Sequence, residues 1–441
     1  MNPRLILPLA AMMLDPRVTR TPRRVLGELR RRGIRRMPAA VDKRFGGALP
    51  NSGVLAFVAR WLDGERLTWH RGQWVLNSFL PPIPSPAYER LFTNMLSVRR
   101  ISPVSAYFAV TASCPYACWH CSLARRAGGG ELSTDVWRNA IRGGIELGVS
   151  LIGFTGGEPL MRADLPELVR AAAAGGAATI VFSSGAGAEP SVLRTLQQAG
   201  LWAFCVSLDD ADTAVHDRLR NHAGAHAAAV RAVRAARRAG LYTIIGAVAT
   251  RALLEERRLP RLHAFAGALG AQELRLVEPM PCGRLAEAPD ATWLTPAQVR
   301  ELRRFHVETN RRGRGPKVCA FNQVESPEFF GCGAGTQHFF VDAAGEVCPC
   351  DFTPLSFGNL AREPLAAIWT RMNTAFGGNP RSHCFMQRHH ALVARHTAGQ
   401  PLPLPPEVSE RIAREAGPEP LPGYFEMVMR GGPDRPKELS E

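Results

Sequence analysis

Three cysteines, Cys114, Cys118 and Cys121, lie in one short segment of the chain. Three thiolates in one loop can bind three irons of a cubane cluster, which leaves the fourth iron without a protein ligand and open to a small chelating molecule. A structural zinc ion needs four ligands, usually in two pairs, and His120 lies between two of the cysteines, where tetrahedral ligation by all of them is cramped. The spacing therefore favours an iron–sulfur cluster with one open iron over a zinc site.

A second group of cysteines lies in the C-terminal third of the chain. Because the cysteines are closely spaced, and because Asp15-Pro16-Arg17 stands where a signal peptide would need small residues, we expect metal ligation in a reduced, cytoplasmic compartment and no disulfides. Cys205 and Cys282 are expected to be non-ligands. The second group consists of Cys319, Cys332, Cys348, Cys350 and Cys384.

Residues 104–280 alternate short apolar runs with amphipathic helical stretches. Unbroken apolar strands between helices indicate a parallel sheet, and we predict an α/β fold with a partial (β/α)6 barrel of the TIM type, a doubly wound sheet being the alternative. Glycines after four helices stand where left-handed C-terminal caps are needed. The strands are expected at 106–112, 151–155, 179–182, 203–208, 243–249 and 273–277; the helices at 134–147, 165–174, 192–199, 225–239 and 259–269; and the caps at Gly148, Gly200, Gly240 and Gly270.

The polar residues that could act on a ligand follow the predicted strands. The triplet follows the first strand, at the carboxyl end of the sheet, where α/β folds place their reactive groups. After the second strand, Gly156 and Gly157 allow a close backbone approach to a ligand, and Glu158, before Pro159, can accept a hydrogen bond from a cationic amine. The remaining candidates, at or after the third and fourth strands, are Ser183, Ser184, Ser207, Asp209 and Arg220.

The C-x3-C-x2-C triplet and the Gly156-Gly157-Glu158-Pro159 turn together resemble the radical S-adenosylmethionine superfamily. The resemblance implies a [4Fe–4S] cluster on Cys114, Cys118 and Cys121 with S-adenosylmethionine bound to it. It also implies that Ser183, Ser184, Ser207, Asp209 and Arg220 contact the ribose and carboxylate of this cofactor. Ser184 departs from the asparagine common in relatives, helix capping is the alternative role for Ser207 and Asp209, and a plain surface position is the alternative for Arg220.

The C-terminal part is similar to the SPASM or shortened twitch extension of radical enzymes. Cys332 is followed by twelve residues, Gly345, four more residues and Cys350, and Cys384 comes later. The resemblance implies one auxiliary [4Fe–4S] cluster on Cys332, Cys350 and Cys384, with Cys348 or Cys319 as the fourth ligand or with an iron left open.

The family resemblance implies an enzyme that reductively cleaves S-adenosylmethionine and abstracts a hydrogen atom from an unidentified substrate with a 5′-deoxyadenosyl radical. An external flavodoxin- or ferredoxin-like donor would supply the electron. Peptide modification or cofactor biosynthesis is the favoured role, and a membrane lipid is the alternative substrate. A non-catalytic iron–sulfur carrier or sensor explains the cysteines but not Gly156–Pro159, and a zinc-stabilised nucleic-acid binder explains only charge and cysteines.

The 441-residue chain has a formal net charge of +15, concentrated in residues 1–45, which hold 12 Arg and Lys against 3 acidic residues. A basic helix at 21–36 is expected to lie on an anionic membrane or a partner, or to present a solvated face, which is the favoured interpretation. No nucleic-acid motif is found, so nucleic acid is not an expected partner. We expect a leader at 1–100, the core at 101–282, the cysteine-rich extension at 283–395, a further helix at 296–311, and a loosely packed tail at 396–441.

Overall fold

The computed structural model describes residues 3–20, 24, 52–96, 102–126, 130–397 and 399–429. The basic helix expected at 21–36 lies outside the described residues, Arg24 excepted. No helix among the described residues is both long and apolar enough to cross a membrane.

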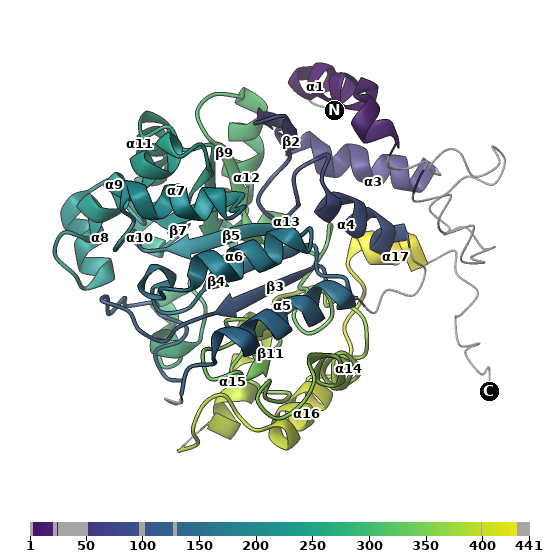
Figure 1. Cartoon of the computed structure of the whole chain (residues 1–441), viewed down its shortest axis with the longest axis vertical. Helices are drawn as coiled ribbons and strands as arrows, with labels where there is room; N and C mark the ends of the chain where they lie inside the picture. Colours follow the sequence, from purple (N-terminus) through teal and green to yellow (C-terminus); the bar gives the residue numbers. More distant parts are fainter. Residues whose placement is uncertain are drawn as a thin grey trace.

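A nine-stranded sheet with the order β11-β10-β3-β4-β5-β6-β7-β8-β9 organises the chain (Figure 1). The six strands expected from the sequence are present and run parallel, which confirms the α/β prediction. β9 and β10 extend the parallel set at either side, and β11 pairs antiparallel with β10. The strands are β3 (Ser105–Ala109), β4 (Leu151–Thr155), β5 (Ala178–Ser183), β6 (Ala203–Ser207), β7 (Tyr242–Val248), β8 (Glu273–Val277), β9 (Lys317–Ala320), β10 (His338–Val341) and β11 (Val347–Cys348).

Helices between the strands cover one face of the sheet. Phe108, Phe154 and Phe204 point toward these helices and are fully buried with Trp137 of α5, because residues of one strand face opposite sides in alternation. The four expected glycine caps all have positive φ, from 75° to 111°. The helices are α5 (Thr134–Leu147), α6 (Leu165–Ala174), α7 (Pro190–Gln198), α8 (Thr213–Arg220), α9 (Ala225–Arg238), α10 (Arg251–Glu255), α11 (Leu259–Ala268) and α12 (Pro296–Arg312).

The described part of the N-terminal region packs against the amino ends of the strands. The buried Lys317, at the start of β9, donates from Nζ to the carbonyls of Val75 at 2.6 Å and Leu76 at 3.1 Å. The backbone N–H of Ser78 donates to Glu273 at the start of β8, at 3.2 Å. These bonds satisfy buried charges that the sheet alone would leave unpaired. The region contains α1 (Pro3–Leu14), α3 (Ser52–Asp63), β1 (Thr68–His70), β2 (Gln73–Val75) and α4 (Pro86–Leu96).

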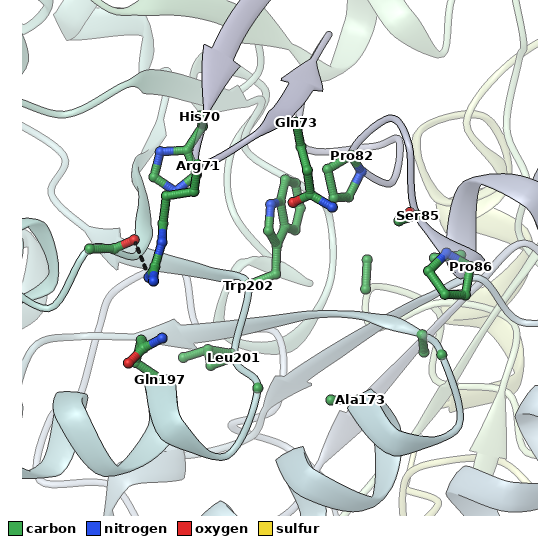
Figure 2. Close-up of a pocket in the computed structure, with 16 residues that line it drawn as sticks. His70, Arg71, Gln73, Pro82, Ser85, Pro86, Ala173, Gln197, Leu201 and Trp202 are labelled. Carbon is green, nitrogen blue, oxygen red and sulfur yellow. Dashed lines mark hydrogen bonds between the residues drawn. The ribbon is translucent and has the colours of Figure 1, made fainter. Parts of the chain in front are cut away.

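A cavity of about 360 Å³ lies beneath the β1–β2 hairpin (Figure 2). His70, Gln73 and Trp202 line it, and Arg71 closes one side by donating to the Gly240 carbonyl at 3.2 Å. Because Trp202 and Gly240 directly precede β6 and β7, this cavity is at the amino ends of the strands. None of the residues predicted to bind a cofactor or metal lines it.

The C-terminal residues are folded, so the expectation of a loosely packed tail is wrong for the described part of it. Leu404 and Ile412 are fully buried in the main core, and Tyr424 and Phe425 pack against Phe57 of α3. The apolar residues of this segment, although interspersed with prolines and charged residues, are sufficient to pack it against the rest of the protein. The elements are α13 (Phe321–Val324), α14 (Leu365–Ala375), α15 (Phe385–Thr397), α16 (Pro406–Glu415) and α17 (Gly423–Met429), and α12 confirms the helix expected at 296–311.

Candidate active site

The cysteine triplet occupies the loop that follows β3, at the carboxyl ends of the parallel strands. Cys114 is exposed, and Cys118 and Cys121 are half-buried. Burial, together with negative charge on the other two thiols and on Glu158, raises the pKa of Cys114 to about 11, so Cys114 lies within electrostatic range of these three groups. The fold therefore brings the three thiols together beside Glu158.

The Gly156-Gly157 turn after β4 holds the segment that leads into Cys114. The N–H of Gly157 donates to the Thr111 carbonyl and that of Glu158 to the Ser113 carbonyl, both at 2.7 Å. A Cβ atom on Gly157 would lie 2.1 Å from the Ser113 oxygen, and Gly156 has a φ of +136°. Only glycines permit this approach, so the turn positions the triplet loop through its backbone.

Glu158 is fully buried, and serines at the end of β5 fix its carboxylate. It accepts hydrogen bonds from the Ser183 hydroxyl at 2.8 Å, from the Ser184 N–H at 2.7 Å and from the Ser184 hydroxyl at 2.6 Å. Burial raises the pKa of Glu158, while these bonds favour its charged form. The two serines predicted to contact the cofactor thus orient Glu158. Ser184, which stands where relatives commonly have asparagine, does so through its hydroxyl and its backbone N–H.

Asp209 and Arg220 form a buried ion pair of 2.7 Å beside the triplet. Arg220 also donates to the Cys118 sulfur at 3.8 Å, so it is not a surface arginine. Asp209 accepts from the N–H of Val248, and Asp212 is the N-cap of α8, so Asp209 does not cap that helix. Burial alone would raise the pKa of Asp209, but the positive charge of Arg220 keeps this pKa below its usual value. Ser207 is the last residue of β6 and lies two residues before Asp209 in the chain.

Several buried polar atoms around the triplet have no hydrogen-bond partner within the described chain. They are the Trp119 indole nitrogen, His120 Nδ1, His216 Nε2 and Arg220 Nε. Unpaired buried donors and acceptors are costly, and their concentration here fits a site built around a polar or charged group. Trp119 belongs to the triplet loop itself, whereas His216 lies here because α8 packs against that loop, through a hydrogen bond from the Trp119 backbone N–H to the Leu219 carbonyl at 3.1 Å. Neither residue was singled out from the sequence as a site residue.

The second site joins Cys332, Cys350 and Cys384. The Cys332 and Cys384 thiols are hydrogen-bonded, which lowers the pKa of Cys332 to about 7. Burial raises the pKa of Cys350, with smaller contributions from negative charge on Asp351 and on Cys332. Cys384 directly precedes α15, and the backbone N–H groups of Phe385 and Gln387 in its first turn stabilise the thiolates. The structure therefore brings together the three residues predicted as the main auxiliary ligands.

Cys348 and Cys319 have other partners. Cys348 accepts a hydrogen bond of 3.2 Å from the buried Arg126, and it contacts Ala109 and Phe340. Cys319 is buried on β9, where Glu273 and Lys317 are among its charged neighbours. Neither joins the trio in this structure, so the prediction of Cys348 as a metal ligand has no support from its position.

The compactness of the cysteine groups bears on the zinc site considered from the sequence. A tetrahedral zinc ion binds sulfur at about 2.3 Å, which draws its ligand atoms to within about 4 Å of one another. Within the ranges that the structure describes, the only compact group of three His, Cys, Asp or Glu residues is His338, Cys350 and Asp351, with ligand atoms within 4.8 Å. Neither cysteine trio forms so compact a group among the described residues.

Comparisons with known proteins agree with this geometry. Residues 108–256 match the radical SAM superfamily, and residues 332–385 match the iron–sulfur cluster-binding SPASM domain. The chain is 34% identical over 289 residues to the PqqA peptide cyclase of Xanthomonas campestris pv. campestris, covering 60% of this chain and 73% of that protein. It is 25% identical over 288 residues to the AdoMet-dependent heme synthase of Methanosarcina barkeri, covering 59% and 80%.

A solved structure has the same fold. The crystal structure of Streptococcus suis SuiB bound to the precursor peptide SuiA matches with a TM-score of 0.53 at 16% identity, covering 64% of this chain and 67% of that one. The relatives in sequence are enzymes, so a non-catalytic carrier does not account for the family match. The chain belongs to the radical SAM superfamily: it is an iron–sulfur enzyme of S-adenosylmethionine with a SPASM extension.

Proposed function

We propose that this enzyme modifies a peptide by radical chemistry that begins with S-adenosylmethionine. The proposal depends on one observation: two separate cysteine trios lie on one sheet, one after β3 and the other beside β10 and β11. The relatives at 34% identity are named peptide cyclases, which supports a peptide as the substrate. A cluster with bound S-adenosylmethionine supplies a 5′-deoxyadenosyl radical that removes a hydrogen atom from the substrate.

In this proposal each group around the first trio has a distinct task. Cys114, Cys118 and Cys121 hold the catalytic cluster. Glu158, oriented by its serine donors, accepts a hydrogen bond from the amino group of the cofactor. Arg220 balances the charge of the Cys118 thiolate while Asp209 fixes its guanidinium group, and Ser207 is positioned for the ribose.

Cys332, Cys350 and Cys384 hold the auxiliary cluster in this proposal, with no fourth cysteine. Three thiolates leave one iron without a cysteine ligand, so this cluster is suited to binding substrate or a non-cysteine donor there. The buried Arg381 pairs through its backbone with Cys332, and its cation offsets part of the thiolate charge.

We also propose a setting for the enzyme. Its chemistry needs single electrons at low potential, for which a flavodoxin- or ferredoxin-like donor in the cytoplasm is suited. The 12 basic residues of positions 1–45 support a peripheral contact with an anionic membrane. A membrane lipid is the second candidate substrate, because a contact with the membrane would bring the enzyme to it.

The proposal is tested with anaerobically reconstituted full-length protein, dithionite and S-adenosylmethionine. The expected product is 5′-deoxyadenosine, and Cys→Ala replacement of all three triplet cysteines abolishes it. Cys205→Ala, which removes a thiol from the sheet core, is the matched control and retains activity. A triple variant that still forms 5′-deoxyadenosine contradicts the assignment.

The substrate class is tested by isotope transfer in the same reaction. A deuterated peptide encoded beside the gene is expected to transfer deuterium into 5′-deoxyadenosine. Deuterated membrane lipid in vesicles is the competing arm. Label that comes from the lipid and not from the peptide would reject peptide modification and leave the radical chemistry intact.

A further inference from the structure

α1 is apolar on two opposite sides. Its inner side packs on the N-terminal region, with Leu5 only 2% exposed against Leu67 and Leu76. At 3.6 residues per turn, Leu7 and Leu14 fall opposite Leu5, and Ile6 and Met13 fall on the flank between the two sides. We call these four exposed side chains the outer face of α1. They are Ile6 at 47% exposure, Leu7 at 79%, Met13 at 62% and Leu14 at 80%. A helix that is apolar all round is normally covered, so this outer face needs a partner.

Exposed arginines lie on α1, in the segment that follows it and at the end of α12. A Cβ atom on Gly313 would lie 3.1 Å from Arg4 Nη1, so α1 lies beside the end of α12. The nearby carboxylates already have arginine partners: Asp15 pairs with Arg17 at 2.7 Å, Asp63 pairs with Arg311, and Glu308 pairs with Arg312 at 2.9 Å. These three pairs are neutral, and the excess of positive charge in this region comes from residues 1–45, which hold 12 Arg and Lys against 3 acidic residues. The arginine rim consists of Arg4, Arg17, Arg20, Arg312 and Arg314.

Trp69 of β1 adds an exposed aromatic group beside Arg17, three residues after the end of α1. It is 51% exposed, and the Arg17 guanidinium lies 5.9 Å from its ring. Tryptophan prefers the interface between lipid head groups and acyl chains, because its ring is apolar and its N–H is polar. Figure 1 shows α1 at the periphery of the molecule, beside α3 and away from the sheet.

We propose that the outer face of α1, the arginine rim and Trp69 form a docking surface for an anionic lipid bilayer. The apolar side chains enter the head-group boundary, and the arginines contact lipid phosphates, as in amphipathic helices that lie in the plane of a membrane. This surface involves neither cysteine trio, and it specifies the membrane contact proposed above.

The docking surface also sets the orientation of the enzyme. The end of α12 leads into the start of β9, so the surface lies toward the amino ends of the strands, whereas the cysteine triplet follows the carboxyl end of β3. A docked molecule therefore turns its active site away from the bilayer. This orientation suits a peptide that arrives from the aqueous side and opposes a lipid extracted from the same membrane.

Vesicle co-sedimentation of the full-length reconstituted enzyme tests the proposal. Vesicles of phosphatidylcholine with 30% phosphatidylglycerol are expected to bind at least about tenfold more protein than phosphatidylcholine alone, and salt is expected to weaken the binding. Leu7→Ser with Leu14→Ser is expected to lower binding by about tenfold. Leu7→Ile with Leu14→Ile retains the apolar surface and is the matched control. Brominated lipid is expected to quench tryptophan fluorescence less in the Trp69→Phe variant.

Three results would overturn the proposal. The first is equal binding of the serine variant and the native protein. The second is a concentration-dependent dimer in sedimentation velocity that the serine variant abolishes, since a second copy would then cover the outer face. The third is a thermal midpoint several degrees lower in the serine variant, since another part of the chain would then cover it. Formation of 5′-deoxyadenosine in solution stays unchanged in this variant, so docking and radical chemistry fail independently.

Discussion

At the residue scale, two cysteines that are two positions apart in sequence have different surroundings. Cys350 lies with Cys332 and Cys384, whereas Cys348 is bonded to Arg126. We expect Cys350→Ala to lose about four of the roughly eight irons that two cubanes hold, and Cys348→Ala to retain all of them. Iron and sulfide analysis, with electron paramagnetic resonance of the reduced protein, measures this. If Cys348→Ala loses iron and Cys350→Ala does not, then Cys348 is the ligand and Cys350 is not.

At the scale of the element, the backbone of the turn after β4 is as important for positioning the triplet loop as the side chains around it. Gly157→Ala would force a Cβ atom to 2.1 Å from the Ser113 carbonyl, so the turn and the triplet loop must separate. We expect destabilisation of about 1–3 kcal/mol, loss of the catalytic cluster and retention of the auxiliary one. Thermal unfolding, iron content and 5′-deoxyadenosine formation measure these effects.

Gly143→Ala is the matched control for this element. Its Cβ atom would meet only Leu365 at 3.7 Å, and because Gly143 lies within α5, alanine is expected to be neutral or to stabilise the helix by up to about 1 kcal/mol. Equal loss of the catalytic cluster in both variants would show that the fold tolerates no added volume at either position. The positioning role assigned to the Gly157 turn would then be wrong.

At the scale of the whole molecule, buried neutral histidines make folding sensitive to acid. Burial lowers the pKa of His306, between α12 and β9, to about 4, whereas the unfolded chain has a pKa near 6.5. Its contribution is therefore fully present above pH 6.5 and is lost as the pH falls toward 4. His306→Gln should lose less stability than the native protein between pH 6.5 and 4.5, by about 2–3 kcal/mol. Urea unfolding at both values measures the difference, and equal losses would contradict it.

The sequence predicted those parts of the molecule that depend on local patterns. The six strands, the glycine caps and the triplet at a strand end follow from apolar runs and residue types over short distances. The bonds that decide the roles of side chains could not be predicted, because they join distant segments: Arg126 reaches Cys348 across 222 positions, and Arg220 reaches Cys118 across 102. The packing of residues 399–429 was missed for the same reason, since Ile412 is buried only by partners far away in the sequence.

The contacts of Lys317 with Val75 and Leu76 bear on how the protein can be divided. The ammonium group is 1% exposed, and its hydrogen-bonding carbonyls belong to the segment after β2. A chain shortened to begin after this segment would remove both carbonyl acceptors of the ammonium group, so the sheet would lose stability although none of its strands was removed. The segment near residues 65–80 is therefore part of what stabilises the catalytic sheet, although it contributes no strand to it.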